Sequence, residues 1–500
     1  MKITPETTID AYKIGHRRQF IPGMTLAFGN MTPRKSYRQI TPKSGVVWVG
    51  AQYFFKEFLI KQWNENFFQK PKEEVVQRFT RRINNYLGPN DVGVEHIAAL
   101  HDLGYLPLAF FCLPEGSLVP YKVAPLIYFT THKDFGWLQA YVETIMSCNI
   151  WPISTAATTA KQIKDLLSKY AMETVGNTDF VKFQGHNFSY RGCVGHEAAI
   201  LIDAGFITSF VGSDTVPGVE FMEEYYNANS DQELVSCSVN ASEHAVMASY
   251  GPENEIEAFR RLIEDVYPRG IVSIVSDTRD YWRVINEFTI TLKDKILARD
   301  GKTVFRPDSG DNVKIIIGDP DAPEGSVENK GTIERLWEIF GGTVNAKGYK
   351  ELNPKVGAIL GDGVNWDVLN KICEGLKKKG FASTNIVYGI GSYYLVYGIS
   401  RDTDGWAVKS TYVEVNGEGR EIFKDPKTDQ GNLKKSAKGL IAVYKDKDGV
   451  YYQKDQVSWD EVLNCEFIPT FLNSQLLKDW TLSEIRSLLE SQNQAETYLK

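Results

Sequence analysis

The central stretch of the chain, from about residue 200 to residue 400, repeats one pattern: a short apolar run that ends abruptly in glycine or polar residues. The runs occupy 271–275, 302–305, 356–360 and 385–388. Segments with helical periodicity lie between them, at 279–297, 332–340 and 366–379. Apolar strands that alternate with helices are typical of a parallel sheet covered on both faces. We therefore predict an α/β fold built from consecutive βα units.

Each of these predicted strands ends in residues that can take part in chemistry. The four runs precede Ser276-Asp277, Arg306-Pro307-Asp308, Gly361-Asp362 and Gly389-Ile390-Gly391, in that order. A further strand is predicted at 206–211, before Gly212-Ser213-Asp214. A doubly wound sheet would concentrate such groups at one switch point, whereas a β/α barrel distributes them around one face. The distribution favours a barrel.

The two flanks of the chain differ from this central stretch. After residue 405, two pairs of strand-like runs are joined by Asn416-Gly417 and by a turn at 446–449, which predicts two β-hairpins. Helices are predicted at 72–87 and 482–491, and 136–170 is expected to be helical at both ends with a turn near Trp151-Pro152. We predict a barrel domain at 146–404 and a second α+β sheet domain formed by 1–145 and 405–500.

Composition excludes several classes of protein. A chain of 500 residues is too long for one ordinary core, and its net charge of -7 argues against general attraction to nucleic acid. The six cysteines form no C-x-x-C pair, which favours free thiols in a reducing compartment. The first residues lack the apolar core of a signal peptide, and no run is long enough to cross a bilayer. We expect a cytoplasmic protein without a membrane partner.

Several common catalytic motifs fail at a specific residue. A phosphate-binding P-loop ending at 301–303 would need glycine where Ile296 stands, and GIGSYY at 389–394 has Tyr394 in place of the third glycine of a dinucleotide fingerprint. GDGVNW fails in the same way at Trp366, and HEAAI at 196–200 lacks the second histidine of a zinc helix. These failures remove the ordinary kinase, dehydrogenase and metalloprotease interpretations.

The remaining candidates are charged residues, aromatics and glycines, each with a structural alternative. Arg306 and Asp308, two positions apart at a strand end, face the same side and could bind an anion and a hydroxyl pair, or form only a salt bridge. Gly361-Asp362 and Gly391 could hold a sugar phosphate, or serve as plain turns. His244, Phe188 beside Arg191, and Tyr12 are candidates that could equally be packed or solvated residues.

These segments, in this order, resemble the nicotinamide phosphoribosyltransferase family. The similarity extends from IDAYKIGH near the start to FKDP at 423–426, through LPEGSLVP, NFSYRG, GSDTVPG, SEH, VSDTRD, RPDSG, GDG and GIGSYYLVYGISRD. It implies an irregular, type II phosphoribosyltransferase-like β/α barrel packed on a second α+β sheet domain. It also implies a head-to-tail homodimer with shared active sites at the subunit interface.

The resemblance also implies roles for individual residues. Phe188 would stack on nicotinamide together with Tyr12 of the partner subunit, and Asp214 would accept from the carboxamide N–H. His244 would be phosphorylated by ATP, with Asp277 as its orienting partner. Arg306 and Asp308 would act at the pyridine ring and the ribose. The phosphoribosyl and phosphate groups would contact Arg191, Ser238, Ser273, Gly361, Asp362, Gly391, Ser392, Arg401, Lys409 and Lys424. Ser189, Asn240 and Ser392 replace a glycine, a proline and a glycine of animal members, and the loop before Arg401 is one residue longer.

The implied reaction joins the ring nitrogen of nicotinamide to the anomeric carbon of 5-phosphoribosyl 1-pyrophosphate (PRPP), with Mg²⁺ as cofactor and ATP as activating co-substrate. Catalysis would rest on positioning and on stabilisation of the departing pyrophosphate. A nicotinate phosphoribosyltransferase is the nearest alternative, although Asp214 would repel the carboxylate of nicotinate. A sugar-phosphate barrel lyase or isomerase would more often carry a lysine at a strand end. A nucleotide-binding regulator without activity would not need His244 with Asp277.

Overall fold

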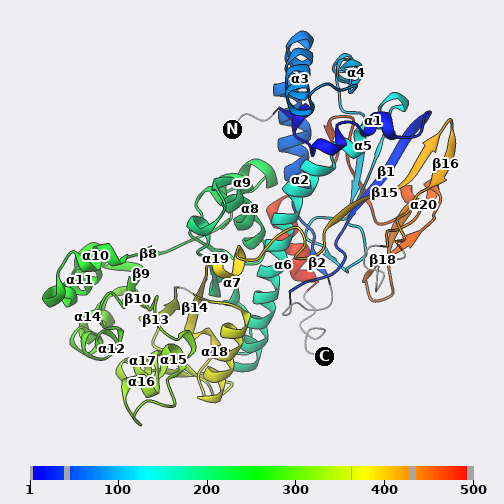
Figure 1. Ribbon diagram of the computed structural model, residues 1–500. Helices are drawn as coiled ribbons and strands as arrows, with labels where there is room; N and C mark the ends of the chain where they lie inside the picture. The colour runs from blue at the N-terminus through cyan, green and yellow to red at the C-terminus, as the bar shows by residue number, and fades with distance from the viewer. Residues whose placement is uncertain (1–3, 39–44, 362, 427–434, 493–500) are drawn as a thin grey trace. The chain divides into compact units, whose positions relative to one another are not determined.

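The computed structural model describes residues 4–38, 45–361, 363–426 and 435–492. The described chain forms two compact units (Figure 1). The first comprises the residues up to Thr158, Phe221–Ala228 and Ile399–Gln492, and the second comprises Thr159–Glu220 and Asn229–Gly398. The sequence suggested boundaries at 145/146 and 404/405, and it did not separate 221–228 from the central stretch.

The second unit contains the parallel sheet expected from the repeated pattern. Its strand order is β7-β6-β14-β13-β10-β9-β8, and each neighbouring pair is parallel. The predicted runs correspond to β9 (Arg269–Val275), β10 (Asp300–Arg306), β13 (Val356–Leu360) and β14 (Ile386–Ile390). The remaining strands of this sheet are β6 (Gly185–Asn187), β7 (Gly212–Ser213) and β8 (Asn240–Ala241), while β11 (Gly342–Val344) and β12 (Lys350–Leu352) form a separate antiparallel pair. The carboxyl ends of these strands therefore share one edge, where the candidate residues follow them.

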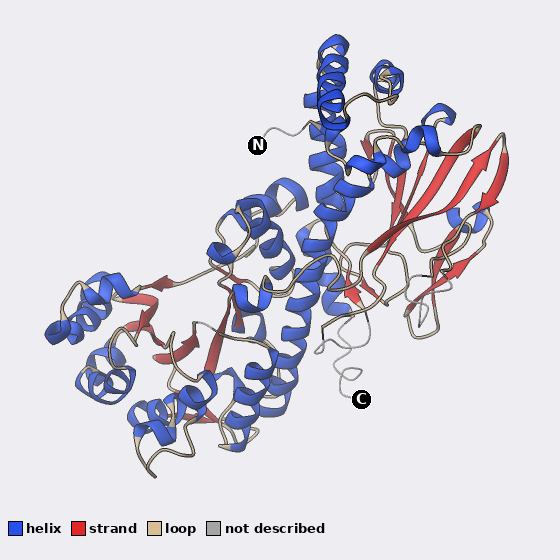
Figure 2. Ribbon diagram, viewed as in Figure 1, coloured by secondary structure: helices blue, strands red, loops and turns tan. Residues whose placement is uncertain are grey.

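The segment 237–240 runs from one edge of this sheet, at β7, to the opposite edge, at β8. Cys237 pairs with Gly212 of β7, and only three residues later Asn240 pairs with Val272 of β9. The parallel sheet therefore curls, and helices lie around it in Figure 2. An α/β protein with an irregular, curled parallel sheet and a separate antiparallel sheet is confirmed as the fold class.

The first unit contains the antiparallel sheet, in the order β16-β15-β1-β5-β3-β19-β20. Both predicted hairpins are present. The turn of the first has Asn416 and Gly417 at φ of 52° and 82°, the left-handed values that a two-residue hairpin turn requires. The strands of this unit are β1 (Met24–Thr32), β2 (Val46–Val47), β3 (Leu108–Cys112), β4 (Leu118–Val119), β5 (Leu126–Thr130), β15 (Ala407–Val415), β16 (Glu418–Glu421), β17 (Ile441–Lys445), β18 (Tyr451–Asp455), β19 (Ile468–Leu472) and β20 (Gln475–Leu476).

The predicted helices at 72–87, 332–340 and 482–491 are confirmed as α3, α17 and α21. No helix in the described parts of the chain is both long and apolar enough to span a bilayer.

The α-helices of the first unit are α1 (His16–Gln19), α2 (Ala51–Tyr53), α3 (Lys72–Leu87), α4 (Glu95–Leu103), α5 (Leu138–Tyr141), α20 (Trp459–Leu463) and α21 (Leu482–Ser491). Those of the second are α7 (Val181–Gln184), α8 (His196–Phe206), α10 (His244–Ala248), α11 (Glu255–Arg261), α12 (Tyr281–Arg283), α13 (Thr289–Thr291), α14 (Lys293–Ala298), α15 (Asn312–Ile317), α16 (Val327–Lys330), α17 (Thr332–Phe340), α18 (Trp366–Lys378) and α19 (Ser392–Leu395). The unit boundaries fall inside α6 (Glu143–Thr174) and α9 (Pro217–Tyr226).

Two local predictions are wrong. The apolar run at 206–211 is not a strand, because α8 extends to Phe206 and helical turns continue with Phe210 N donating to the carbonyl of Phe206. Only Gly212–Ser213 forms β7. The expected turn at Pro152 is also absent, since α6 is continuous through it. A proline inside a helix costs about 3 kcal/mol, and the fully buried side chains of Ile150 and Ile153 on either side offset that cost.

Candidate active site

A cavity of about 480 Å³ opens within the second unit. Its lining combines apolar side chains from the strands with a few polar groups, which is the usual composition of a small-molecule site. Five of the predicted site residues line it: Phe188, Asp214, Ser238, Ser273 and Arg306. The structure thus brings together residues that are as far as 118 positions apart in the sequence (306 minus 188).

Asp214 follows β7 and is held by two hydrogen bonds. His186 Nε2 donates to Oδ1 of Asp214 at 3.1 Å, and the Ser238 hydroxyl donates to the same oxygen at 2.6 Å. Within the described parts of the chain, no hydrogen bond reaches the other oxygen, Oδ2. Burial alone would raise the pKa of the Asp214 carboxyl, but the bonds from His186 and Ser238 outweigh it, so that the pKa is lowered. Asp214 therefore stays ionised with one oxygen available to a ligand.

Phe188 follows β6 and packs against a strand that has no side chain at the point of contact. A Cβ on Gly389 of β14 would lie 2.2 Å from Cδ2 of Phe188, so only glycine fits there. On another side, the His186 ring centroid lies 4.9 Å from that of Phe188. The lack of a side chain at Gly389 therefore makes room for the aromatic ring of Phe188.

Arg306 and Asp308 interact with each other at the end of β10, as their spacing indicated. Arg306 Nε lies 3.3 Å from Oδ1 of Asp308, and Arg306 Nη2 donates to the carbonyl of Ser242 at 2.8 Å. Gly361 follows β13 directly beside them, where a Cβ would lie 1.8 Å from Oδ1 of Asp308. The absence of a side chain at Gly361 therefore permits the approach of the Asp308 carboxylate.

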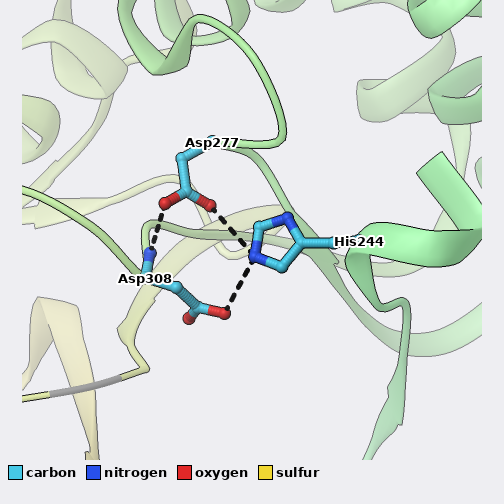
Figure 3. A group of neighbouring side chains, drawn as sticks. All are labelled: His244, Asp277 and Asp308. Atoms are coloured by element: carbon cyan, nitrogen blue, oxygen red, sulfur yellow. Dashed lines mark hydrogen bonds and ion pairs between the residues drawn. The ribbon is translucent and has the colours of Figure 1, made fainter. Parts of the chain in front are cut away.

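His244 begins α10 and lies close to two carboxylates (Figure 3). Its Nε2 is 3.9 Å from Oδ1 of Asp277 and 3.6 Å from Oδ2 of Asp308, while its Nδ1 is 3.1 Å from the Thr278 hydroxyl. The His244 side chain is 51% exposed, whereas that of Asp277 is only 5% exposed. Asp277 is fixed in turn, because its Oδ2 accepts from the backbone N–H of Asp308 at 3.0 Å and from the Ser309 hydroxyl at 2.5 Å.

This group of three residues has the chemistry of a divalent-cation site. One ligand atom from each of His244, Asp277 and Asp308 lies within 4.8 Å of the others. Carboxylate oxygens are the ligands that Mg²⁺ prefers. Oδ1 of Asp277 is buried and accepts no hydrogen bond from any residue that the structure describes. The two carboxylates therefore fit the magnesium ion that the resemblance implies.

Three further predicted residues of the second unit belong neither to the lining of the 480 Å³ cavity nor to the group of His244, Asp277 and Asp308. Arg191 is exposed in the turn Tyr190–Gly192, and Gly391 and Ser392 stand at the start of α19. Asp362 lies outside the described residues. The predicted phosphate roles of these residues stay predictions.

Four predicted residues belong to the first unit: Tyr12, Arg401, Lys409 and Lys424. Lys409 lines a cavity of about 380 Å³ together with Arg34, Lys122 and Lys435. Burial, with Arg34, Lys424 and Arg401 nearby, lowers the pKa of Lys409. A group of cations at one cavity is suited to a polyphosphate. Tyr12 is 65% exposed, as a residue available to another molecule would be.

The sequence interpretation missed two residues of the second unit, His186 and Asp203. His186 lies in β6 two positions before Phe188, which directly follows that strand, and this extended spacing could have identified it. Asp203 is a lone acid within the apolar run AAILIDAGF of α8, and a buried acid in such a run is itself a signal. The basic residues Arg34 and Lys122 had no comparable local signal.

Comparisons with known proteins agree with this geometry. The profile of the nicotinate phosphoribosyltransferase (NAPRTase) family matches residues 183–461. The chain is 47% identical over 502 residues to a nicotinamide phosphoribosyltransferase of Acinetobacter baylyi, covering 98% of each chain. It is 32% identical over 449 residues to one of Mycoplasma pneumoniae, covering 84% of this chain and 92% of the relative. The fold is similar to that of a nicotinate-nucleotide pyrophosphorylase from Pyrococcus furiosus, with a TM-score of 0.58 at 16% identity over 100% and 97% of the two chains.

Proposed function

The chain belongs to the nicotinate phosphoribosyltransferase family, and from that premise we propose that it transfers the phosphoribosyl group of PRPP to nicotinamide. The products are nicotinamide mononucleotide and pyrophosphate. The relatives from Acinetobacter baylyi and Mycoplasma pneumoniae bear the name of this activity. The enzyme is thus a pentosyltransferase that acts in the salvage of nicotinamide for NAD.

The observation that carries the choice of nicotinamide over nicotinate is the environment of Asp214. Its carboxylate is ionised, held at Oδ1 by His186 and Ser238, and it lines the same cavity as Phe188. An ionised acceptor binds the N–H of a carboxamide, whereas it repels a second carboxylate. Nicotinate, whose carboxylate carries a full negative charge at neutral pH, would have to approach this group.

The residues of the site position the two reactants. Phe188 stacks on the pyridine ring while Asp214 accepts from its carboxamide, which aims the ring nitrogen at the anomeric carbon. The new C–N bond forms as the bond from that carbon to pyrophosphate breaks, and the positive charge passes to the pyridinium ring. Arg306 lies beside the ring and Asp308 accepts from the ribose hydroxyls. Holding both reactants in this geometry supplies much of the rate enhancement.

The departing pyrophosphate is the second centre of charge. The family resemblance assigns phosphate contacts to Arg191, Ser392 and the backbone of Gly391 in the second unit. It assigns the pyrophosphate region to the cations Arg401, Lys409 and Lys424 of the first unit. Mg²⁺, when bound by Asp277 and Asp308, supplies neutralisation of negative charge on the phosphate oxygens. Ser238 and Ser273 complete the ribose side of the site, with Gly361 and Asp362.

ATP enters this proposal through His244. Transfer of the γ-phosphoryl group of ATP to a ring nitrogen of His244 releases ADP, and later hydrolysis of the phosphohistidine releases phosphate. The carboxylates of Asp277 and Asp308, 3.9 and 3.6 Å from Nε2, lie where they can orient the ring. The half-exposed position of His244 suits a residue that must meet a second nucleotide.

The proposal includes a cytoplasmic homodimer with shared active sites. Tyr12 is exposed in the first unit, and we propose that Tyr12 of the partner subunit covers the face of nicotinamide opposite Phe188. The free cysteines are consistent with a reducing compartment.

Product formation from PRPP and Mg²⁺, with nicotinamide or nicotinate and with or without ATP, tests the proposal. Nicotinamide mononucleotide formed from the amide alone supports it, and stimulation by ATP supports the role of His244. Product from the acid alone would keep the fold and the reaction but overturn the role of Asp214. No product from either pyridine would contradict the proposed function.

A further inference from the structure

A carboxylate that the proposed reaction does not use lies beneath the pyridine-binding residues. Asp203 is 0% exposed, and it belongs to α8, whose neighbouring residues Ile202 and Ala204 are apolar and buried. No cation is ion-paired with Asp203 within the described parts of the chain. A buried acid without a cation needs hydrogen bonds to compensate its desolvation, and Asp203 obtains them from two strand ends.

The two hydrogen bonds come from corresponding positions of neighbouring strands. Asn187 ends β6 and Ser213 ends β7, and the two residues are register partners in the parallel pair. Asn187 Nδ2 donates to Oδ1 of Asp203 at 2.6 Å, and the Ser213 hydroxyl donates to the same oxygen at 2.6 Å. One carboxylate oxygen therefore joins the ends of both strands.

Each strand end then leads directly into a pyridine-binding residue. Phe188 follows Asn187, and Asp214 follows Ser213. The Asn187 side chain also accepts from the backbone N–H of Ser189 at 2.9 Å. These contacts fix the backbone before and after Phe188.

The second strand end is fixed in the same way. Ser213 Oγ accepts from the backbone N–H of Thr215 at 2.9 Å, and the N–H of Asp214 donates to the carbonyl of Asn187 at 3.0 Å. Through Asn187 and Ser213, Asp203 is connected to the backbone on both sides of Phe188 and of Asp214.

From these contacts we propose that Asp203 is a positioning residue for pyridine recognition: its carboxylate sets the distance between the stacking ring of Phe188 and the selecting carboxylate of Asp214. The inference rests on the proposed function, because it takes Phe188 and Asp214 as the pyridine contacts. An apolar residue of similar size would serve packing alone at lower desolvation cost. Such an apolar residue would have no oxygen to accept hydrogen bonds from both Asn187 and Ser213.

The space around Asp203 explains why the carboxylate cannot move to another partner. A Cβ on Gly218 would lie 1.9 Å from Oδ2 of Asp203, so the α9 backbone closes that side. Oδ2 accepts no hydrogen bond from the described residues. All of the positioning interactions that the structure gives are therefore made through Oδ1.

The test compares Asp203→Ala and Asp203→Asn in the full-length protein. Asp203→Asn keeps a carbonyl oxygen that can accept from both Asn187 and Ser213, whereas Asp203→Ala keeps none. We expect Asp203→Ala to raise the KM for nicotinamide by at least about tenfold, with the KM for PRPP within about twofold of wild type. Asp203→Asn should recover most of the loss. Ser209→Ala, which removes another buried hydroxyl close to the end of α8, should leave both KM values unchanged.

Two outcomes would overturn the positioning role. One is an unchanged KM for nicotinamide in Asp203→Ala, and the other is a parallel loss for both substrates, with no recovery in Asp203→Asn. If Asp203→Ala does not fold, the Ser213→Ala variant removes one of the two bonds and should give a smaller shift of the same kind. If the wild-type protein uses neither pyridine, the proposed function fails. A crystal structure of the Asp203→Ala variant then still decides whether Phe188 and Asp214 move apart.

Discussion

Two polar clusters lie at the carboxyl edge of the parallel sheet, and they are built differently. The Asp214 cluster, formed by Asp214, His186 and Ser238, is held by hydrogen bonds of 2.6 and 3.1 Å. In the His244 cluster, formed by His244, Asp277 and Asp308, the imidazole lies 3.6 and 3.9 Å from the carboxylates. Asp214 and His244 are about equally exposed, at 52% and 51% of their side-chain surface, but Asp214 accepts two hydrogen bonds from neighbouring side chains, whereas the imidazole of His244 makes no short contact with either acid.

The difference corresponds to the two kinds of ligand in the proposed reaction. A small flat ring is recognised best by groups that are already fixed, because any reorganisation on binding reduces affinity. A polyphosphate with its metal ion brings its own charge, and a site for it gains from carboxylates and an imidazole that are not fully satisfied by one another. Substitutions in the two clusters, and at the arginine that contacts both of them, test this contrast.

Arg306 links the clusters, because it lines the cavity with Asp214 and also pairs with Asp308. We expect Arg306→Ala to lower kcat/KM by about a thousandfold, or ~4 kcal/mol, through loss of a charged group at the reacting centre. Arg306→Lys keeps the positive charge but not the planar set of N–H donors of the guanidinium, and it should recover only part of the activity. Steady-state kinetics with both substrates measures the loss. A decrease below about tenfold would contradict the linking role.

Asp214→Ser should change specificity more than total activity. Removing the ionised acceptor lowers the preference for nicotinamide over nicotinate, and we expect the ratio of the two kcat/KM values to fall by about ten- to a hundredfold. Competition between the two pyridines at equal concentration measures this ratio directly. Ser238→Ala removes one of the two bonds to Asp214 but keeps its charge, so it should change the ratio less than Asp214→Ser does. An unchanged ratio in Asp214→Ser would remove this residue from the specificity argument.

His244→Ala should affect the second cluster alone. We expect it to abolish the stimulation of product formation by ATP, a change of about tenfold or less, while basal synthesis from PRPP persists. The rate with and without ATP, and the incorporation of labelled phosphate from γ-labelled ATP, provide two separate measurements. Equal loss of basal and stimulated rates would refute the phosphohistidine role, and so would labelling of the variant.

Asp203 gives the smallest expected effect, a dependence of stability on pH. Burial raises the pKa of Asp203 to about 7, well above its ordinary value near 4. Because the pKa is raised on folding, the contribution of this group is fully present below about pH 4 and is lost as the pH rises through about 7. Asparagine does not titrate, so the Tm of Asp203→Asn minus that of wild type should increase by a few degrees between pH 5 and pH 8.

All other titrating groups are common to the two proteins compared in that experiment and cancel in the difference. Thermal unfolding at a series of pH values, in buffers of equal ionic strength, measures it. A difference in Tm that does not change with pH would show that Asp203 has the same protonation state in the folded and unfolded chains.

Much of the fold follows from local patterns in the sequence. The helix Lys72–Leu87 and the strand Val356–Leu360 were predicted at their observed ends, because their apolar spacing and flanking residues agree. The run at 206–211 was misjudged because a short apolar run fits a buried strand and a buried helix end equally well. Pro152 was misjudged because tertiary burial outweighed its local preference.

From the sequence, we could predict the site residues that directly follow a recognisable strand, but not the others. Asp214, Asp277, Arg306 and Asp308 each follow a predicted strand, and the parallel topology brings strand ends together. The link from Asp203 to Asn187 and Ser213 joins a helix to two strands, and no periodicity in one segment encodes such a contact. The cations Arg34 and Lys122 share a cavity with Lys409 through long-range folding of the first unit, which local sequence does not specify.

The two glycines that contact the site have a consequence for how this sequence can vary. Gly361 and Gly389 lie so close to Asp308 and Phe188 that even a methyl group would overlap them, by the distances of 1.8 and 2.2 Å given above. In a library of all single substitutions, we expect replacements at Gly389 to be rejected and replacements at Gly361 to displace the Asp308 carboxylate and lower activity. Tolerance at Gly361 is thus set by the Asp308 side chain, and tolerance at Gly389 by the Phe188 ring together with the carbonyl of Leu360, which would lie 2.9 Å from a Cβ.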